Sequence, residues 1–224
     1  KISDKLRWQN KAYRKAYQVN LVKQMLLSLE PQSREYLYVL RGGFCASVIR
    51  QIDQKTQTNY CNTRFCSTCE RIRKAKRIDA YLEPISKIED PYFVTLTIKS
   101  VGIDQLRDSI QSMTSIWRAS RKYFSRKKII TSGIKTIEFN YNPKLKTFNP
   151  HFHIIINSKA NAELLTAYWL KYNEGTSTRA QDMRPILKND KNTLFEVFAY
   201  TTKTIVQGKV YPHILAQSIH ALMD

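Results

Sequence analysis

Two histidines on either side of one apolar residue, His151 and His153 around Phe152, could carry chemistry in this sequence. Residues 154–157, three isoleucines and an asparagine, continue them in a pattern typical of a β-strand. Residues i and i+2 of a strand point to the same face, so the two imidazoles would lie side by side while Phe152 enters the core. Two neutral imidazoles directed at one point suit a divalent metal ion, although an isolated pair is more often structural or exposed.

The segments around the histidines predict a sheet that would position them. Residues 134–141 form an expected strand, and a polar turn at 142–149 connects it to the histidine strand at 152–157. In an antiparallel hairpin of these two strands, Glu138 lies in a row next to the histidines. A third strand is expected over residues 92–98. Its two faces carry Phe93, Thr95 and Thr97, and Val94, Leu96 and Ile98.

Helical periodicity on either side of these strands indicates the fold class. Residues 103–124 and 160–172 predict amphipathic helices, residues 181–187 a short strand, and residues 192–205 a further helix. The expected fold is therefore α+β, with a central antiparallel sheet and flanking helices.

The last of these helices carries three functional groups on one side. Glu196, Tyr200 and Lys203 follow one another at i, i+4 and i+7, so a helix would align a carboxylate, a phenol and an amine. Ordinary amphipathic packing explains a tyrosine in such a place equally well in a chain with 13 tyrosines. The neighbouring charges and the histidine pair upstream favour a chemical role for Tyr200.

All four cysteines lie in one stretch with the spacing C-x15-C-x4-C-x2-C: Cys45, Cys61, Cys66 and Cys69. The C-x-x-C pair is typical of a metal knuckle, and two more thiolates would complete a tetrahedral site for which zinc is the usual metal. Disulfides or free thiols are the alternative, but a basic chain without a signal peptide suggests a reducing cytosol. A four-thiolate site has no open position, so we expect a structural zinc ion.

These patterns divide the chain into three expected parts. Apolar residues at helical spacing indicate a helical segment at 1–40, and Pro31 ends that pattern. The cysteines define a small zinc module at 41–89, and the strands and helices described above form a domain at 90–224. No apolar run approaches the length of a membrane span.

The charge of the chain points to a polyanionic partner. Lysine and arginine number 37 against 18 acidic residues, and the resulting net charge of +19 exceeds what solubility requires. Nucleic acid is favoured over a membrane surface because no short amphipathic anchor stands out; a solvated basic surface is the remaining alternative. Candidate phosphate contacts beside the cysteines are Arg64, Arg71, Arg73, Lys74 and Arg77, and those near residue 120 are Arg118, Arg121, Lys122, Arg126, Lys127 and Lys128.

Three segments together resemble the motifs of HUH endonucleases, and specifically of the Rep initiators of rolling-circle plasmids. They are the F-V-T-L-T strand at residues 93–97, the histidine pair around Phe152, and the tyrosine segment with Tyr200 and Lys203. The subgroup with a single catalytic tyrosine, a glutamate four residues before it and an upstream cysteine cluster is the most similar. Asn149 stands where a histidine often begins the second motif of this family, outside the ligand pair.

The resemblance implies an RRM-like core and a set of roles for individual residues. Glu138 is implied as the third ligand of a catalytic Mn²⁺ or Mg²⁺ with His151 and His153. Tyr200 is implied as the nucleophile that forms a 5′-phosphotyrosyl DNA intermediate and frees a 3′-hydroxyl for a polymerase. Lys203 would stabilise the phenolate or the phosphate, because an unassisted tyrosine with a pKa of about 10 is a poor nucleophile. Glu196 would act as the base for the second cut.

The resulting hypothesis is a sequence-specific, metal-dependent enzyme that nicks and rejoins single-stranded DNA. The expected partners are a single-stranded or hairpin origin and the host helicase and polymerase, in a bacterial cytoplasm, with the oligomeric state left open. Related HUH transposases or relaxases are close variants. The alternative from another class is a non-catalytic, zinc-containing nucleic-acid-binding module in which the histidines are structural. A Walker-type phosphate loop, and with it an ATP-driven helicase, is excluded because the sequence contains no such glycine-rich motif.

Overall fold

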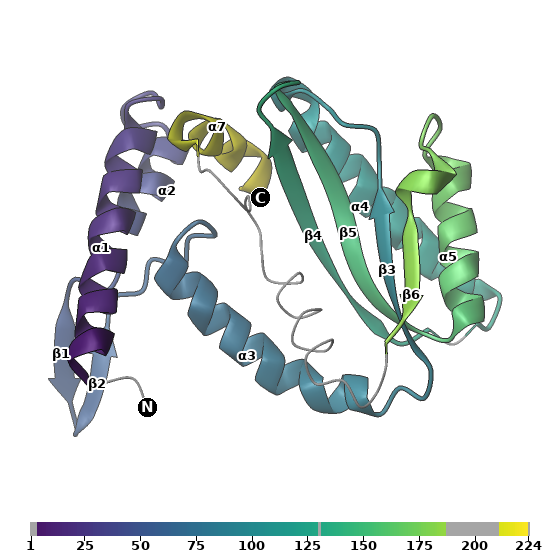
Figure 1. The fold of residues 1–224 in the computed structure, drawn as a ribbon, viewed down its shortest axis with the longest axis horizontal. Coiled ribbons are helices and arrows are strands. Elements are labelled where there is room, and N and C mark those ends of the chain that lie inside the picture. The colour runs from purple at the N-terminus through teal and green to yellow at the C-terminus, as the bar shows by residue number, and fades with distance from the viewer. Residues whose placement is uncertain (1–3, 130, 187–210, 224) are drawn as a thin grey trace. The chain divides into compact units, whose positions relative to one another are not determined.

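The computed structural model describes residues 4–129, 131–186 and 211–223 (Figure 1). The chain divides into two compact units, Lys1–Arg73 with Lys209–Asp224 and Lys74–Gly208. The expected division into three parts remains a prediction. In the structure, the C-terminal helix α7 (Pro212–Leu222) packs against helices of the N-terminal region. None of the described helices is long and apolar enough to cross a membrane.

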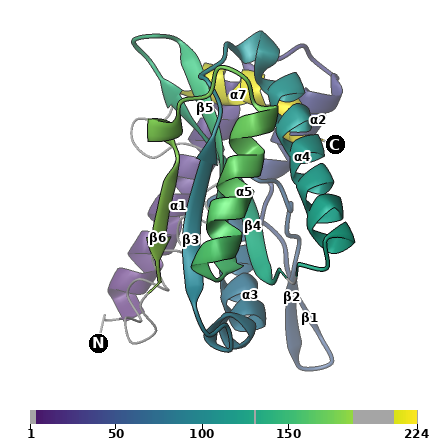
Figure 2. The ribbon, with the colours of Figure 1, turned by 90° about the vertical axis from the view of Figure 1, so that its right-hand side faces the viewer.

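The second unit is built on a four-stranded antiparallel sheet in the order β4-β5-β3-β6, which Figures 1 and 2 show. The histidine strand β5 lies in the interior, paired with β4 on one side and β3 on the other. This arrangement confirms the predicted α+β fold with a central antiparallel sheet. The strands are β3 (Pro91–Thr97), β4 (Gly133–Asn142), β5 (Thr147–Asn157) and β6 (Asp182–Pro185).

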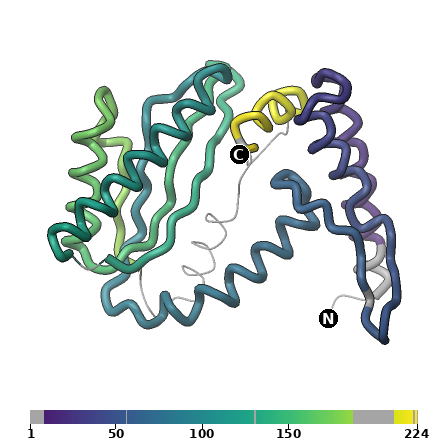
Figure 3. Tube along the Cα trace, turned by 180° about the vertical axis from the view of Figure 1, so that it is seen from behind, coloured from purple at the N-terminus to yellow at the C-terminus, as the bar shows by residue number. Residues whose placement is uncertain are grey.

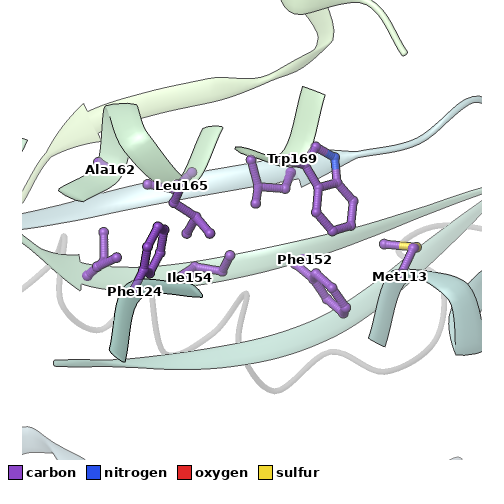
Figure 4. Close-up of a cluster of buried hydrophobic side chains, with 10 residues drawn as sticks. Met113, Phe124, Phe152, Ile154, Ala162, Leu165 and Trp169 are labelled. Carbon is purple, nitrogen blue, oxygen red and sulfur yellow. The ribbon is translucent and has the colours of Figure 1, made fainter. Parts of the chain in front are cut away.

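Two helices, α4 (Ile103–Arg126) and α5 (Lys159–Tyr172), cover one face of this sheet (Figure 2). Phe152 points into the core between them, as the alternation of β5 predicts, and is fully buried. Figure 4 shows Phe152 and Trp169 in the same buried cluster. Their ring centroids lie 5.5 Å apart. The indole nitrogen of Trp169 also donates a hydrogen bond of 2.8 Å to the carbonyl of Thr97. Packing and this hydrogen bond together fix α5 on strand β3.

The opposite face of the sheet is apolar at one end and polar at the other. At the apolar end, Phe93 and Ile155 pack against Ile85 from the C-terminal turn of α3 (Ser67–Ser86). Further along the same strands, this face carries the side chains of Glu138, His151 and His153. Burial of the apolar end stabilises the strands, and these strands in turn hold the polar residues in register.

The first unit combines helices α1 (Asp4–Leu26), α2 (Arg34–Gly43) and α7 with the cysteines and a two-stranded hairpin, β1 (Ile49–Ile52) and β2 (Lys55–Thr58); Figure 3 traces their path. Ser33 caps α2 by accepting a hydrogen bond from the backbone of Tyr36. Gly42 permits close packing near the end of α2, because a Cβ there would lie 2.6 Å from the ring of Phe65. The end of α2 is therefore packed directly beside the residue that precedes Cys66.

One local prediction was wrong in detail. The polar turn expected at 142–149 is confined to residues 143–146, because Asn142 pairs with Thr147 and Tyr141 packs on Phe148, with 5.1 Å between the ring centroids. The expected helical segment at 1–40 consists of two helices, because α1 ends at Leu26 and α2 starts at Arg34; Pro31, which was predicted to end the first helical pattern, lies between them. The helix expected at 192–205 lies outside the described residues.

Candidate metal centres

Pairing of three strands brings the polar residues of the histidine motif together. Glu138 of β4 lies directly opposite His151 of β5, and His153 lies between Thr136 of β4 and Thr95 of β3. Directly opposite residues of antiparallel strands have Cβ atoms about 4.5–5.5 Å apart, within reach of a shared ligand. The structure therefore assembles the three ligand residues that the resemblance implied.

The Glu138 carboxylate faces both imidazoles from a buried position. Its Oε2 lies 3.2 Å from Nε2 of His153 and 3.8 Å from Nε2 of His151, and the three residues are at most 7% exposed. This oxygen nevertheless makes no hydrogen bond to any part of the chain that the structure describes. A buried, unsatisfied carboxylate oxygen is costly, and a cation bound between the three side chains would satisfy it. The donor set thus fits a divalent metal ion.

Hydrogen bonds at the far side of each imidazole orient the candidate ligands. Nδ1 of His151 lies 2.9 Å from the carbonyl oxygen of Asn149. Because a carbonyl only accepts, this Nδ1 carries the proton and Nε2 keeps its lone pair for a metal. Nδ1 of His153 lies 3.2 Å from the hydroxyl of Thr95, and its ring stacks on Phe93 with the centroids 5.3 Å apart. Both Nε2 atoms are consequently directed at Glu138.

Burial also keeps His151 in the form that binds metals. It lowers the pKa of His151 below the ordinary value of 6.5, and the nearby His153 acts in the same direction. The hydrogen bond to Asn149 and the charge of Glu138 oppose this effect without cancelling it. His151 is therefore neutral at physiological pH, as a metal ligand must be. Two imidazoles and one carboxylate leave open coordination positions, which is typical of a catalytic site.

The four cysteines form a second cluster, in the first unit, and all of them are buried. The Sγ atoms of Cys45 and Cys61 lie 3.5 and 3.6 Å from Sγ of Cys69, and all four sulfurs lie within 4.8 Å of one another. Four sulfurs at 2.3 Å from a tetrahedral zinc ion would be about 3.8 Å apart. No disulfide joins these cysteines. The cluster fits a small zinc module, and Cys45 belongs to it despite its distance in the sequence.

The surroundings of the cysteines favour a thiolate at Cys61, whereas the interaction with Cys61 raises the pKa of Cys66 and burial raises the pKa of Cys69. Hydrogen bonds from Cys66 and Thr63 lower the pKa of Cys61 to about 4. The backbone N–H of Asn62 points at Sγ of Cys69 from 3.3 Å. Such N–H···S contacts are the outer-shell bonds that stabilise metal-bound thiolates.

The predicted phosphate contacts occupy different environments in the structure. Arg73 donates hydrogen bonds to the carbonyls of residues 62–64, so its guanidinium braces the loop that follows Cys61. Lys74 is half-buried. The others are exposed: Arg64, Arg71, Arg77, Arg118, Arg121, Lys122, Arg126, Lys127 and Lys128. The exposed basic residues remain predictions as DNA contacts.

Sequence reasoning missed some residues of the sites and named others that the structure leaves undescribed. Thr95 was placed on the correct face of its strand, but its contact with His153 depends on pairing across 58 positions. Asn149 acts through its backbone carbonyl, which no residue pattern reveals. Tyr200, Glu196 and Lys203 lie outside the described residues, so their predicted roles stay predictions.

Comparison with known proteins agrees with this geometry. The model of a family described as "Replication protein" matches residues 53–162, a range that includes three of the four cysteines, the F-V-T-L-T strand and the Glu138–histidine site. "Protein rep" of Staphylococcus aureus is 28% identical over 180 residues, which cover 72% of this chain and 77% of that protein. "Protein rep" of Bacillus amyloliquefaciens is 29% identical over 113 residues, covering 47% of this chain and 32% of that protein.

A further relative matches over a similar number of residues. "Protein rep" of Streptococcus pneumoniae is 24% identical over 115 residues, 47% of this chain and 35% of that protein. No solved structure matches the chain. The matched range contains all of the candidate metal ligands except Cys45. The chain is similar to the Rep family of replication proteins, and these matches confirm its resemblance to the initiators of rolling-circle plasmids.

Proposed function

We propose that this protein starts rolling-circle replication by nicking one strand of the plasmid origin and becoming covalently attached to it. The observation that carries the proposal is the buried Oε2 of Glu138, which faces two imidazole Nε2 atoms and lacks a hydrogen bond to the described chain. A structural histidine pair would satisfy this oxygen. A site for a divalent ion leaves it unsatisfied until the ion binds.

The chain's own residues would divide the work of metal binding and phosphate chemistry. Glu138, His151 and His153 would hold Mn²⁺ or Mg²⁺, which on binding supplies positive charge to polarise the scissile phosphate. The sheet keeps these ligands rigid, and the hydrogen bonds of His151 to Asn149 and of His153 to Thr95 fix their orientation. Rigid ligands avoid reorganisation as charge develops on the phosphate oxygens.

The nucleophile is proposed from the sequence to be Tyr200. Its phenolic oxygen would attack phosphorus and form a 5′-phosphotyrosyl bond, while the bond to the 3′ oxygen breaks and leaves a free 3′-hydroxyl. Lys203 would stabilise the phenolate or the phosphate. Glu196 would accept a proton from water at the second cut, which releases the strand. Because the energy of the broken ester is kept in the phosphotyrosyl bond, ATP is not required.

The test is a denaturing gel of the full chain incubated with an end-labelled library of single-stranded DNA and Mn²⁺. We expect a covalent protein–DNA adduct on the 5′ side of the cut, absent with EDTA and absent for Tyr200→Phe. Tyr172→Phe, which removes an exposed hydroxyl on α5, is the matched tyrosine control. His213→Ala, at an exposed histidine of α7, is the control for His153→Ala.

The arms of this experiment separate the competing readings. An adduct that survives Tyr200→Phe would assign the nucleophile to another tyrosine. An adduct that forms in EDTA would overturn metal dependence. Absence of an adduct on every sequence, with tight DNA binding retained, would overturn the enzyme in favour of a zinc-containing binding module.

A further inference from the structure

Two adjoining hollows lie beside the cysteine cluster within the first unit. One measures about 440 Å³ and the other about 380 Å³, and Arg41 and Asn62 line both of them. Their walls come from α2 and from the loop that carries Cys61. Since they share a wall, the two hollows form one continuous surface, which we call the α2 groove.

One half of the α2 groove is strongly basic. Arg34, Arg41 and Arg64 line it, and the residues that line the two hollows include no acidic side chain. Glu35 follows Arg34 in the chain, but its carboxylate pairs with His220 at 2.9 Å. Three guanidinium groups around a hollow of this kind favour an anion with planar oxygen pairs, such as a phosphate.

Contacts beneath the arginines hold this half in shape. Arg41 lies over the ring of Tyr38, with 5.6 Å from Cζ to the ring centroid, and donates a hydrogen bond to the carbonyl of Cys61. The hydroxyl of Tyr38 in turn accepts a hydrogen bond of 2.8 Å from the backbone of Arg64. The basic half is therefore tied to the cysteine loop, so a folded cysteine cluster is needed to form it.

The other half of the α2 groove presents aromatic rings to solvent. Phe44 is 61% exposed and Tyr60 is 49% exposed, and both line the second hollow. The backbone beneath them is fixed, because Asn59 donates a hydrogen bond of 2.7 Å to the carbonyl of Phe44. Exposed aromatic rings next to cations are the combination with which proteins stack unpaired bases and hold the phosphates between them.

We infer that the α2 groove binds unpaired nucleotides of DNA, with Arg34 and Arg64 on phosphates and Phe44 and Tyr60 against bases. This inference rests on the proposed action on origin DNA and extends it with a second contact, remote in sequence from the nicking residues. Unpaired DNA is favoured over duplex because the faces of paired bases are stacked and closed to aromatic side chains, whereas unpaired bases can be splayed out.

The experiment measures the affinity of the zinc-loaded full chain, in a Tyr200→Phe background and without added Mn²⁺ or Mg²⁺ so that no adduct forms, for three fluorescent probes. These are a mixed-sequence single strand, an abasic strand of equal length and a blunt duplex. Phe44→Leu and Tyr60→Leu remove the aromatic face but keep an apolar side chain. Each should weaken binding to the single strand on the order of tenfold and leave binding to the abasic strand unchanged. Phe44→Trp should restore wild-type affinity.

The arginine variants should behave differently from the aromatic ones. Arg34→Ala and Arg64→Ala should weaken binding to both strands, and each should lower the slope of log affinity against log salt by about 0.7. Lys23→Ala, which removes an exposed charge from α1 in the same unit, is the matched control. It should change neither the affinity for the two strands nor the salt slope. Zinc content and circular dichroism identify variants that fail to fold.

The outcomes distinguish this inference from the proposed function. If Phe44→Leu loses as much affinity for the abasic strand as for the single strand, base stacking is overturned. Losses confined to the duplex probe would show that the groove reads paired DNA and would also overturn the inference. Wild-type affinity in all four groove variants, with adduct formation intact in Mn²⁺ when Tyr200 is present, would refute the α2 groove alone and leave the nicking activity standing.

Discussion

The cysteine cluster and the Glu138–His151–His153 cluster are both buried groups of metal-type donors, yet they differ in how completely the donors satisfy one another. The four sulfurs lie close together and form a closed set, and those of Cys61 and Cys69 also have hydrogen-bond partners outside it. The second cluster has three donors, one of which is an unsatisfied carboxylate oxygen. A closed set suits a metal that holds the fold, whereas an open set suits a metal that meets a substrate.

The structural surroundings of the two clusters also suit a stabilising metal in the first and a reactive metal in the second. The cysteines sit in a small unit with two short strands, where α2 and the cysteine loop depend on one another through Arg41 and Gly42. The histidines sit on an interior strand of a sheet that is already stabilised by a large apolar core. We therefore expect the first metal to contribute stability and the second to contribute chemistry.

The largest expected effect is loss of the first unit when a cysteine ligand is removed. Cys66→Ser replaces a fully buried sulfur of the cluster. Zinc binding in small modules supplies on the order of 10 kcal/mol, so this variant should lose its zinc and most of the structure of that unit. Zinc content by mass spectrometry and thermal unfolding check the prediction. Thr63→Val, which removes only the hydroxyl beside Cys61, should keep its zinc. A Cys66→Ser protein with a full zinc content would contradict the assignment.

A large effect of another kind is expected at the histidines. His153→Ala should lower the rate of adduct formation by about 10³-fold or more, because it removes a ligand that positions the charge facing the phosphate. Zinc content and the folded state should be retained, since the larger apolar cluster, around Phe152 and Trp169, lies on the other face of the sheet. Single-turnover nicking rates at saturating DNA measure this effect. A stability loss as large as that of Cys66→Ser would break the distinction between the two clusters.

A smaller effect of opposite sign is expected for Glu138→Gln. Without a metal ion, the wild-type carboxylate is buried and lacks a hydrogen bond to the described chain, whereas the amide is neutral and can donate to an imidazole. The metal-free variant should be more stable than the metal-free wild type by about 1–3 kcal/mol in urea unfolding. Its affinity for Mn²⁺ should fall at the same time. If Glu138 instead formed an ion pair with a protonated His153, the variant would be less stable.

The sequence predicted the parts of both sites that depend on local periodicity. Alternation along β5 places His151 and His153 on one face and Phe152 in the core, because a strand repeats every two residues. The C-x-x-C spacing predicts a knuckle for the same reason, since the two ligands are neighbours in the chain.

Features that depend on pairing between distant segments were harder to predict from the sequence. The hydrogen bond between Thr95 and His153 arises from the register of β3 against β5, which no single strand encodes. The exposed hairpin β1–β2 also escaped prediction, because its polar sequence buries no face and shows no hydrophobic alternation. The interruption between α1 and α2 was predicted from Pro31, but the new helix start at Arg34 follows from the cap at Ser33, whose role was not apparent from helical spacing alone.

The smallest and most selective prediction concerns the two threonines that flank His153. Thr95 and Thr136 lie on either side of it in the sheet, and the hydroxyl of Thr95 contacts Nδ1, at 3.2 Å. The hydroxyl of Thr136 is buried without a hydrogen bond to the described chain. Outer-shell partners of metal-bound histidines typically contribute 10- to 100-fold to affinity, and a threonine hydroxyl should lie at the lower end.

Thr95→Val should therefore weaken Mn²⁺ binding about tenfold, as measured by titration with the folded protein. Thr136→Val makes the same chemical change on the other side of His153. It should leave the affinity for Mn²⁺ unchanged, because the Thr136 hydroxyl makes no hydrogen bond to the described chain. Equal losses in both variants would mean that packing around the ring, rather than the hydrogen bond, orients His153. A loss confined to Thr95→Val would extend the metal site to strand β3, so that the threonine of the F-V-T-L-T motif acts as a positioning residue for the histidine motif.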